Sequence, residues 1–292
     1  MSTSGRRIDL HTHSSVSDGT DSPSELMLAA VTAGLDVIAL TDHDTTEGWL
    51  PAASALPAGL TLMPGAELSC VSDNGSGRRI SVHLLAYLFD PASPAIVTEQ
   101  RRLRVERRAR LRVMAERMAA DGLPVNPDEL MAGLAEDAPA GRPHLARALV
   151  QAGLVADVNE AFGRYLGSGR GYYLPRTDTP VEQAIDMIKA AGGVTVLAHA
   201  FAHSRGPTVS AAVIAGLAAR GLTGLEVNHP NHDPATRAEL RGLASDLDLL
   251  ATGSSDYHGT NKSIALGAET TDPEVFDALV DRSCGSELVA GV

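Results

Sequence analysis

The feature that most limits the fold of this chain is an alternation of two kinds of segment. Short apolar runs rich in β-branched residues alternate with longer stretches of alanine and leucine at helical spacing. This pattern is typical of βα units around a parallel sheet or barrel. We expect seven strands, near residues 8–10, 37–40, 61–63, 80–85, 194–197, 224–227 and 249–252. Seven strands favour a barrel over an open sheet, so the sequence predicts an α/β fold built on a barrel.

Two segments interrupt the alternation. The string Ser72-Asp-Asn-Gly-Ser-Gly77 is rich in turn-forming residues and lies between two strand-like runs, which indicates a hairpin. From about Pro94 to Arg176 the pattern is helical, and βα units resume at Pro180. We therefore expect the barrel to comprise 1–93 and 177–292, and a helical insertion, or cap, to comprise 94–176.

The charge of the chain limits its partners. It has 36 acidic and 24 basic residues, for a formal net charge of −12. Long DNA or RNA is held by clustered lysine and arginine, so this excess of acid argues against long nucleic acid and favours a small anionic ligand. Eight arginines nevertheless fall within about 96–120. They either form a solvated helix face paired with glutamates or line an anion site.

The cysteine count and hydropathy bear on the location of the protein. Two cysteines are too few for a disulfide framework, no run of eighteen apolar residues occurs, and no apolar signal stretch follows Met1 to Arg7. We expect a cytoplasmic protein that does not contact membranes. The sequence leaves the oligomeric state open.

Candidate metal ligands recur where the predicted strands end. Residues two apart on an extended segment point the same way, so His11 and His13, and likewise Asp256 and His258, can grip one ion together. The C-terminal ends of barrel strands converge on one face. A single histidine at such a position is more often structural, but the joint occurrence predicts a metal site. The candidates are His11, His13, Asp18, His43, Glu67, His83, His199, Asp256 and His258.

The ligand types indicate the metal and its chemistry. Imidazole nitrogen and carboxylate oxygen, without nearby thiolate, suit manganese, iron or zinc better than calcium. Nine ligands exceed the needs of one ion, so we expect two or three divalent ions that share Glu67 as a bridge. Manganese is the first candidate, with zinc or iron as alternatives. Such clusters are suited to in-line displacement at phosphorus.

Five motifs identify a family resemblance: HTHSSVSDG, ALTDHDT, GAELS, LAHA and GSSDYHG. Together they resemble the PHP (polymerase and histidinol phosphatase) superfamily of metal-dependent phosphoesterases, from Ile8 to about Gly267. The resemblance implies a distorted (β/α)7 barrel and a trinuclear centre. It also implies three ligand sets: His11, His13, Glu67 and Asp256; Glu67, His83 and His199; and Asp18, His43 and His258. The chain departs from the family at Ala200, where proline is common. It also departs over 201–205, where the family usually has a glycine and arginine pattern that contacts phosphate.

The insertion carries candidate substrate-binding residues. The segments 140–146 and 165–175 resemble the cap of PHP phosphatases that act on nucleotides. Arg142 matches the geometry of a phosphate with two parallel hydrogen bonds, and His144 would assist it. Alternatively, both residues cap a helix that begins near Pro143. Arg170 lies in a glycine-rich turn. In the barrel, His232 corresponds by resemblance to a histidine that approaches the scissile phosphate, whereas His203 and His229 are expected in surface loops.

These observations predict a phosphatase that hydrolyses phosphomonoesters of small nucleotides, either nucleoside 3',5'-bisphosphates or 5'-nucleotides, by attack of a metal-bridging hydroxide. The predicted catalytic residues are Glu67, Asp256, Arg142 and His232, and the predicted substrate-binding residues are Arg142, His144, Arg170 and His232. Four alternatives stay open: a 5'-3' exoribonuclease on short oligonucleotides, a histidinol-phosphate-type phosphatase, an amidohydrolase-like carbon–nitrogen hydrolase, and a silent metal-binding module. Amidohydrolases typically use a bridging lysine or a different ligand order, and neither Lys189 nor Lys262 lies at a predicted strand end.

Overall fold

A computed structural model describes residues 5–134, 140–167, 169–175 and 177–292. The chain divides into two compact units, one of Met1–Glu99 with Asp178–Val292 and the other of Gln100–Thr177. The predicted end of the insertion, Arg176, lies outside the described residues, and so does Ser168 of the predicted glycine-rich turn. Within the described ranges no helix is long and apolar enough to cross a membrane.

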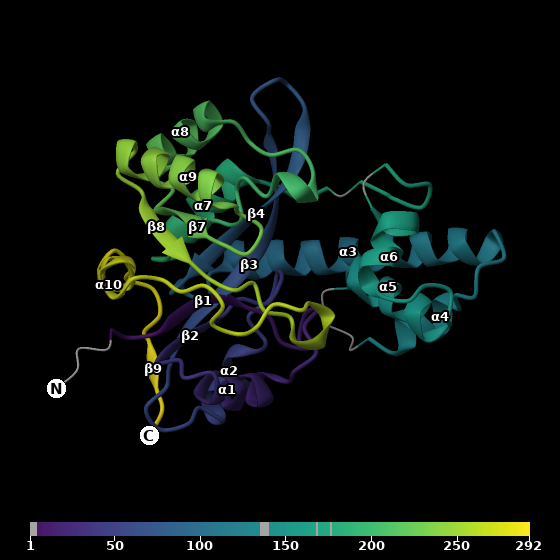
Figure 1. Ribbon diagram of the computed structural model, residues 1–292, viewed down its shortest axis with the longest axis horizontal. Coiled ribbons are helices and arrows are strands. Elements are labelled where there is room, and N and C mark those ends of the chain that lie inside the picture. Colours follow the sequence, from purple (N-terminus) through teal and green to yellow (C-terminus); the bar gives the residue numbers. More distant parts are fainter. Residues whose placement is uncertain (1–4, 135–139, 168, 176) are drawn as a thin grey trace. The chain divides into compact units, whose positions relative to one another are not determined.

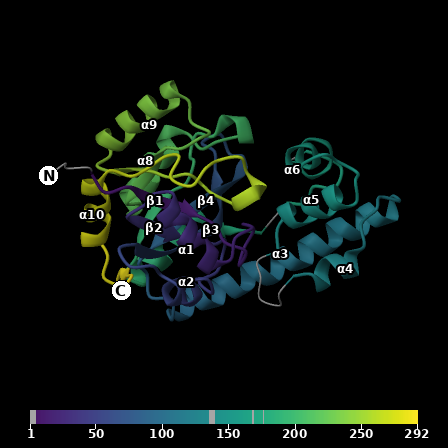
Figure 2. The same ribbon diagram turned by 60° about the horizontal axis from the view of Figure 1, so that its bottom comes forward.

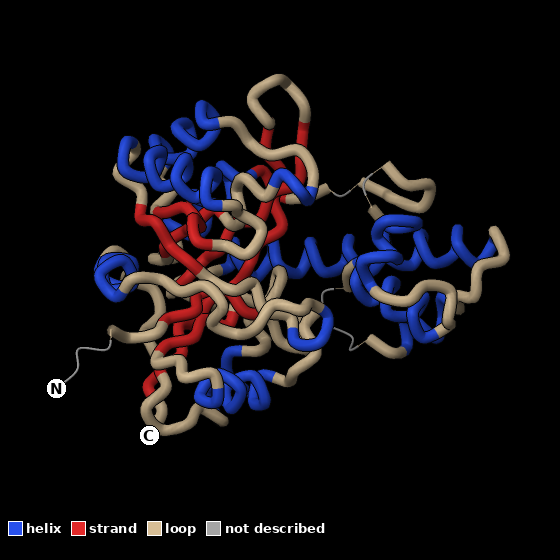
Figure 3. Tube along the Cα trace, in the orientation of Figure 1, coloured by secondary structure: helices blue, strands red, loops and turns tan. Residues whose placement is uncertain are grey.

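The first unit is built on one curved sheet, whose strands lie at its centre with helices outside them (Figures 1 and 3). Its main path runs β1-β2-β3-β4-β6-β7-β8, and two short strands, β5 and β9, pair with β3. The strands are β1 (Ile8–Thr12), β2 (Val37–Leu40), β3 (Thr61–Asp73), β4 (Arg79–Tyr87), β5 (Thr179–Pro180), β6 (Val194–Leu197), β7 (Gly224–Asn228), β8 (Leu250–Gly253) and β9 (Val289–Ala290). This nearly closed sheet confirms the predicted α/β barrel.

One strand explains why the barrel is distorted. β1, β2 and the first part of β3 are parallel, and so are β6, β7 and β8. Between these sets, β4 is antiparallel to both β3 and β6. The β3–β4 ladder extends to the pair Asp73–Arg79, which confirms the predicted hairpin.

Helices surround the sheet of this unit. α1 (Pro23–Thr32) and α2 (Trp49–Ser54) lie beside one another, and α8 (Ala211–Arg220) and α9 (Pro234–Asp246) cover a different part of the sheet (Figures 1 and 2). The remaining helices are α7 (Val181–Ala190), α10 (Pro273–Asp281) and the short 3-10 turns η2 (His203–Arg205) and η3 (Gly259–Asn261). α3 (Pro94–Ala120) begins in this unit and continues into the second.

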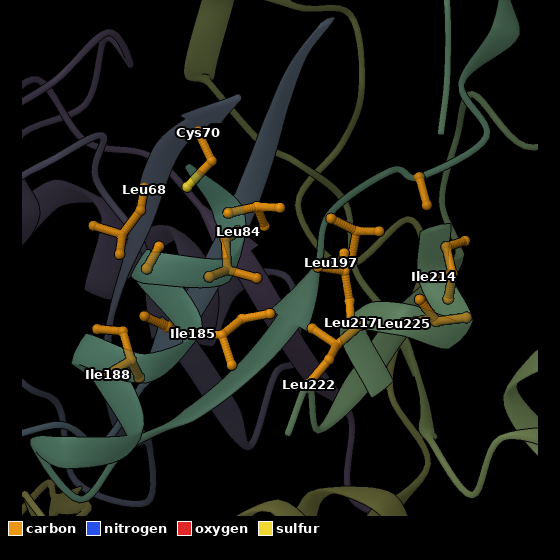
Figure 4. Packing of buried hydrophobic residues seen from close by; sticks show 14 of the residues in the cluster. Leu68, Cys70, Leu84, Ile185, Ile188, Leu197, Ile214, Leu217, Leu222 and Leu225 are labelled. Carbon is orange, nitrogen blue, oxygen red and sulfur yellow. The ribbon is translucent and has the colours of Figure 1, made fainter. Parts of the chain in front are cut away.

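Alternating side chains of the strands pack on both faces of the sheet. In β2, Ile38 and Leu40 belong to the cluster under α1, whereas Val37 and Ala39 join a cluster drawn from β1, β2, β3, β4 and β6. Five strands can share one cluster only on the concave side of a strongly curved sheet. A further cluster packs Leu84, Leu197 and their neighbours against α7 and α8 (Figure 4). Burial of both faces explains why β2 (VIAL) and β6 (VTVL) are apolar along most of their length.

A buried carboxylate closes the gap between the first and last strands of the barrel. The end of β1 meets the loop after β8 through the bridge between Thr12 and Tyr257. Asp9, which is fully buried, accepts hydrogen bonds from the backbone amides of Ser255 (3.0 Å) and Gly267 (2.8 Å). Burial raises the pKa of Asp9, and these hydrogen bonds partly offset that rise. Asp9 therefore replaces part of the missing β1–β8 ladder.

Replacing Asp9 by alanine is expected to destabilise the barrel. The amides of Ser255 and Gly267 would be left buried without acceptors, and each costs about 1–3 kcal/mol. We expect a loss of about 3 kcal/mol in the free energy of unfolding, measured by urea denaturation. The exposed Asp281→Ala serves as control. Equal stability of the two variants would contradict this role of Asp9.

The second unit is helical in its described residues. It contains most of α3, together with α4 (Pro127–Ala132), α5 (Arg142–Gln151), α6 (Val158–Ala161) and the π-helical turn η1 (Phe162–Leu166). In α3, Leu111, Met114, Ala115 and Met118 are buried at helical spacing and pack with Leu145 and Leu149 of α5. The arginines of α3 include i,i+4 pairs such as Arg112 with Glu116. Such pairs agree with the interpretation of a solvated helix face.

Candidate metal centre

The nine predicted ligands all lie in the first unit and come close together. Seven are buried, and His83 and His199 are partly buried. Donor atoms within 4.8 Å of one another form three groups: the first is His11, His13 and Asp256; the second is His43, Glu67 and His83; and the third is His13, Asp18, His43 and His258. The strands of the barrel thus bring together residues that are up to 247 positions apart in the sequence, from His11 to His258.

The first group surrounds one oxygen of Glu67. Glu67 Oε2 is 3.2 Å from His11 Nε2 and 3.1 Å from His13 Nε2. Asp256 Oδ1 is 3.5 Å and 3.6 Å from the same two nitrogens. Four donors at about 2.0–2.1 Å from a tetrahedral ion would be roughly 3.4 Å apart. The four nitrogen–oxygen distances are close to this value, so His11, His13 and Asp256, with Glu67 beside them, suit a single ion in donor type and in nitrogen–oxygen spacing.

The other oxygen of Glu67 faces a second set of histidines. Glu67 Oε1 is 2.7 Å from His83 Nδ1 and 3.2 Å from His199 Nε2. His43 contacts the first oxygen instead, with 3.2 Å between His43 Nδ1 and Glu67 Oε2. Because its two oxygens face different donors, Glu67 has the geometry of a bridging ligand.

Asp18 is the centre of the third group. Asp18 Oδ1 is 3.4 Å from His258 Nε2 and 3.7 Å from His13 Nδ1. Asp18 Oδ2 is 3.7 Å from His43 Nε2. The donor set of this group also suits a divalent ion. His13 and His43 each have one ring nitrogen near this group and the other near Glu67, so all three groups form one continuous cluster.

The expectation that every ligand lies at a strand end was wrong for Glu67 and His83. Glu67 lies in the middle of β3, and His83 lies in the middle of β4. β3 does not end there because it continues into the hairpin after its last ladder pair with β2, Pro64 with Leu40. A single bridge from His43 to Glu67 follows. Glu67 is thus at the carboxyl end of the parallel part of the barrel, which is why it still meets the other ligands.

Two candidate ligands have an unusual backbone. Asp256 has φ 56° and His199 has φ 31°, both in the left-handed region that disfavours residues with a Cβ. Such conformations persist where the surrounding structure holds them, and they concentrate at functional sites. Here they point two donors into one cluster from loops that follow β8 and β6.

Glu226 supports the cluster and was missed by the sequence analysis. It is fully buried in β7. Its Oε1 accepts hydrogen bonds from His11 Nδ1 (2.9 Å) and Ser254 Oγ (2.6 Å), and its Oε2 accepts one from the backbone amide of His199 (2.6 Å). A carboxylate behind a histidine orients the ring for metal binding. The available signal was a lone glutamate within the apolar strand sequence GLEVN.

The carboxylates of the cluster are ionised at neutral pH. Burial alone would raise the pKa of each, but neighbouring side chains lower it by more, so that each pKa lies well below its usual value. The neighbours with the largest lowering effect are His258 and His43 for Asp18, His83 and His43 for Glu67, and Lys262 and His11 for Asp256. The cluster therefore presents three negative charges in a buried site, an arrangement that favours divalent cations.

Two candidate ligands are neutral imidazoles. Burial and then the charge of Arg205 lower the pKa of His199 to about 3. Burial and then the charge of Lys262 lower the pKa of His258 to about 4. Both histidines therefore keep a free lone pair for a metal ion at neutral pH.

Metal binding is expected to release a proton from His11. Burial lowers the pKa of His11, but Glu67, Glu226 and Asp256 raise it by more, to well above its usual value. The ring is therefore protonated at neutral pH in the metal-free protein, and a metal ion must displace that proton. We expect metal affinity to rise with pH until the pKa of His11 is passed. Calorimetric titration with manganese at pH 7, in two buffers of different ionisation enthalpy, measures the released protons; zero release would contradict this expectation.

The two histidines in the loop after β7 differ in which ring nitrogen carries the proton. His229 Nδ1 accepts a hydrogen bond from the Asn231 amide (3.0 Å), so its Nε2 carries the proton, 3.4 Å from Asp256 Oδ2. His232 Nδ1 donates to Val227 O (3.0 Å), so its buried Nε2 offers a lone pair. The expectation that His229 lies in a surface loop was wrong, because its ring is fully buried against the cluster. His203 is exposed, as expected.

The predicted residues of the insertion lie in the second unit. Arg142 donates to Leu166 O (3.0 Å), and its guanidinium lies over the rings of Phe162 and Tyr173. His144 Nδ1 accepts from the Gly141 amide (3.2 Å) at the start of α5, as in the helix-cap alternative. Arg170 is exposed. The roles of these residues toward a substrate stay predictions.

Comparison with known proteins identifies the family. The PHP domain family matches residues 9–119. The chain is 33% identical to a 5'-3' exoribonuclease of Haemophilus influenzae, over 90% of this chain and 93% of that protein. The chain belongs to the PHP family. It is also 33% identical to a 3',5'-nucleoside bisphosphate phosphatase of Chromobacterium violaceum, over 86% of this chain and 87% of that protein.

A solved structure supports the same assignment. A protein from Bifidobacterium adolescentis, described as a metal-dependent phosphoesterase, superposes with a TM-score of 0.88 at 35% identity and covers 96% of this chain and 97% of that one. The predicted membership of the PHP family and the hydrolysis of phosphate esters are therefore confirmed. This PHP protein is a phosphoesterase whose cluster of histidines, aspartates and glutamate can bind metal ions.

Proposed function

We propose that this PHP protein is a metal-dependent phosphatase that releases phosphate from small nucleotides, either nucleoside 3',5'-bisphosphates or 5'-nucleotides. The observation that carries the proposal is the position of Glu67, whose two oxygens face two different sets of donors. A bridged cluster of this kind suits in-line displacement at phosphorus. The proposed ligands are those predicted from the sequence, with Glu226 as support for His11 and His199.

The protein residues position and polarise the reacting groups. When bound, divalent ions lower the pKa of water to about 7 and withdraw charge from phosphate oxygens. Glu67, from β3, and Asp256, from the loop after β8, hold the first group of donors together and fix its orientation. His232, whose Nε2 is buried and lies beside the cluster-facing His229, would contact the phosphate or a sugar hydroxyl. Arg142 would stabilise negative charge on the phosphate.

The substrate class follows from charge and from one relative. The net charge of −12 disfavours long polyanions. The relative from Chromobacterium violaceum, which is similar over most of both chains, acts on nucleoside bisphosphates. Both facts support a small phosphorylated nucleotide, and we propose manganese as the metal and the cytoplasm as the location.

A 5'-3' exoribonuclease on short oligonucleotides is the second candidate. The Haemophilus influenzae relative carries that name, and the chain covers 93% of its length. The two activities share the same chemistry at phosphorus. They differ in whether the phosphate that is attacked is esterified to one nucleoside or to two.

Phosphate release from a panel of substrates tests the proposal. Purified protein is analysed for bound metal and then assayed with manganese on adenosine 3',5'-bisphosphate, AMP, histidinol phosphate and a 5'-phosphorylated dinucleotide. We expect release from the bisphosphate or from AMP. Mononucleotide products from the dinucleotide alone would favour the exoribonuclease. Activity on histidinol phosphate alone would contradict the nucleotide proposal.

A further inference from the structure

Lys262 contacts a proposed metal ligand from the loop after β8. Its Nζ is 2.7 Å from Asp256 Oδ2, and an Arg205 nitrogen donates to the same oxygen at 2.8 Å. The other carboxylate oxygen, Oδ1, faces His11 and His13. Asp256 thus presents one oxygen to the first group of ligands and the other to two cations.

Hydrogen bonds of the residues just before Lys262 fix the position of its backbone. The Thr260 amide donates to Thr20 Oγ1 (3.0 Å), and Asn261 Nδ2 donates to Asp18 O (2.6 Å). Gly259 has φ 64°, and a Cβ there would overlap Thr20 Oγ1, so only glycine permits this close approach. The turn before Lys262 is therefore fixed to the segment that carries Asp18.

Lys262 is suited, by its residue type and its partial exposure, to leave one hydrogen-bond partner for another. Lysine is rare in this chain, with two among 24 basic residues. Its ammonium is a compact charge on a flexible stem, whereas a guanidinium is a rigid fork. The Lys262 side chain is 28% exposed, whereas that of Asp256 is 2% exposed. The ammonium therefore lies at the border between buried ligands and solvent, where an incoming anion arrives.

Once divalent ions are bound, the net charge of the cluster favours binding of an anion. Its carboxylates are Asp18, Glu67, Asp256 and the supporting Glu226. With two or three divalent ions bound, these four negative charges are matched or exceeded. Asp256 would then share its charge with the ions, and its attraction for Lys262 and Arg205 would weaken. A phosphate group restores the balance.

We propose that Lys262 binds the phosphate of the substrate: its ammonium leaves Asp256 Oδ2 to Arg205 and donates to an oxygen of the phosphate group. The proposal rests on the phosphatase function given above. It assigns Lys262 a contact with the phosphate in addition to Arg142 and His232. Inorganic phosphate, the product of the reaction, can therefore serve as the probe.

Acetylation of amines tests the contact directly, because the only other lysine is an internal control. Protein loaded with manganese is treated with a limiting acetylating reagent, with and without inorganic phosphate, and the modified lysines are measured by mass spectrometry. At a phosphate concentration ten times its dissociation constant, we expect Lys262 to react about tenfold more slowly. Lys189, exposed on α7, should react at an unchanged rate. Equal rates for Lys262 with and without phosphate would overturn the proposal.

Matched variants separate phosphate binding from metal binding. Lys262→Gln should weaken binding of inorganic phosphate about 10- to 100-fold while the metal content stays the same. Lys262→Arg should restore part of the affinity, and Lys189→Gln should change nothing. A loss of metal with unchanged phosphate affinity would instead make Lys262 a positioning residue for Asp256. These results do not require that nucleotides be hydrolysed, so failure of the nucleotide assay and failure of this proposal are distinguishable.

Discussion

Replacing Glu67 by glutamine is expected to abolish phosphate release while the fold persists. Glutamine has nearly the same shape, but only one of its two terminal atoms can bind a cation, and the other is an NH₂ group that would face either the first or the second set of histidines. The cluster would therefore lose its bridge. We expect kcat to fall by at least about 10³-fold, because the chemistry supplied by the ions is lost with their position.

Three measurements on Glu67→Gln separate loss of chemistry from loss of structure. Metal content should fall by at least one ion per chain relative to the parent protein. The circular dichroism spectrum should be unchanged. Glu47→Gln, an isosteric change at an exposed glutamate in the loop after β2, should keep full activity and full metal content. Retained activity in Glu67→Gln would refute the bridging role.

The sequence was a good guide to the barrel because its strands are buried on both faces. A strand such as Val37–Leu40 is apolar along its whole length, and the predicted and observed bounds agree. β5 and β9 have two residues each, too few for any periodic pattern, and they were not predicted. The long extension of β3 was predicted only in part, because the hairpin turn was visible whereas the continuous strand through Glu67 was not.

The sequence predicted those site residues that lie in short motifs. It did not predict those that reach the site only through the folding of the chain. His11 with His13, and Asp256 with His258, carry their own signal as pairs two residues apart. The expectation of shared strand geometry was wrong for the second pair, because Asp256 and His258 lie in the loop after β8 and belong to different donor groups. Lys262 and His229 reach Asp256 only because loops fold back onto the cluster. No spacing rule relates them to Asp256, so sequence analysis assigned His229 to the surface and gave Lys262 no part in the site.

Glu226 shows how the cluster depends on groups that bind no metal. Three donors share its two oxygens, and they come from different parts of the barrel: the His11 ring from β1, the His199 amide from the loop after β6 and the Ser254 hydroxyl from the loop after β8. The His199 backbone is in a disfavoured conformation, so its amide needs a fixed acceptor. One buried carboxylate therefore sets the orientation of one ligand and the backbone of another.

Replacing Glu226 by glutamine is expected to lower metal affinity about 10- to 100-fold. The glutamine NH₂ group would face either the His11 N–H or the His199 N–H, and neither can accept a hydrogen bond from it. Metal titration of the apo variant measures the loss. Stability should also fall, by about 2–3 kcal/mol in urea unfolding, because a buried donor loses its acceptor.

A purely structural role for Glu226 makes a different prediction from a positioning role. If Glu226 only stabilised the fold, excess manganese would restore full activity at every pH once the variant was folded. If it also sustains the charge on His11, removing its carboxylate lowers the pKa of that ring, so proton release on metal binding declines at a lower pH in the apo variant than in the parent protein. Glu287→Gln, at an exposed position, should match the parent in affinity, stability and proton release. Unchanged proton release in Glu226→Gln would leave Glu226 without influence on the metal ligands.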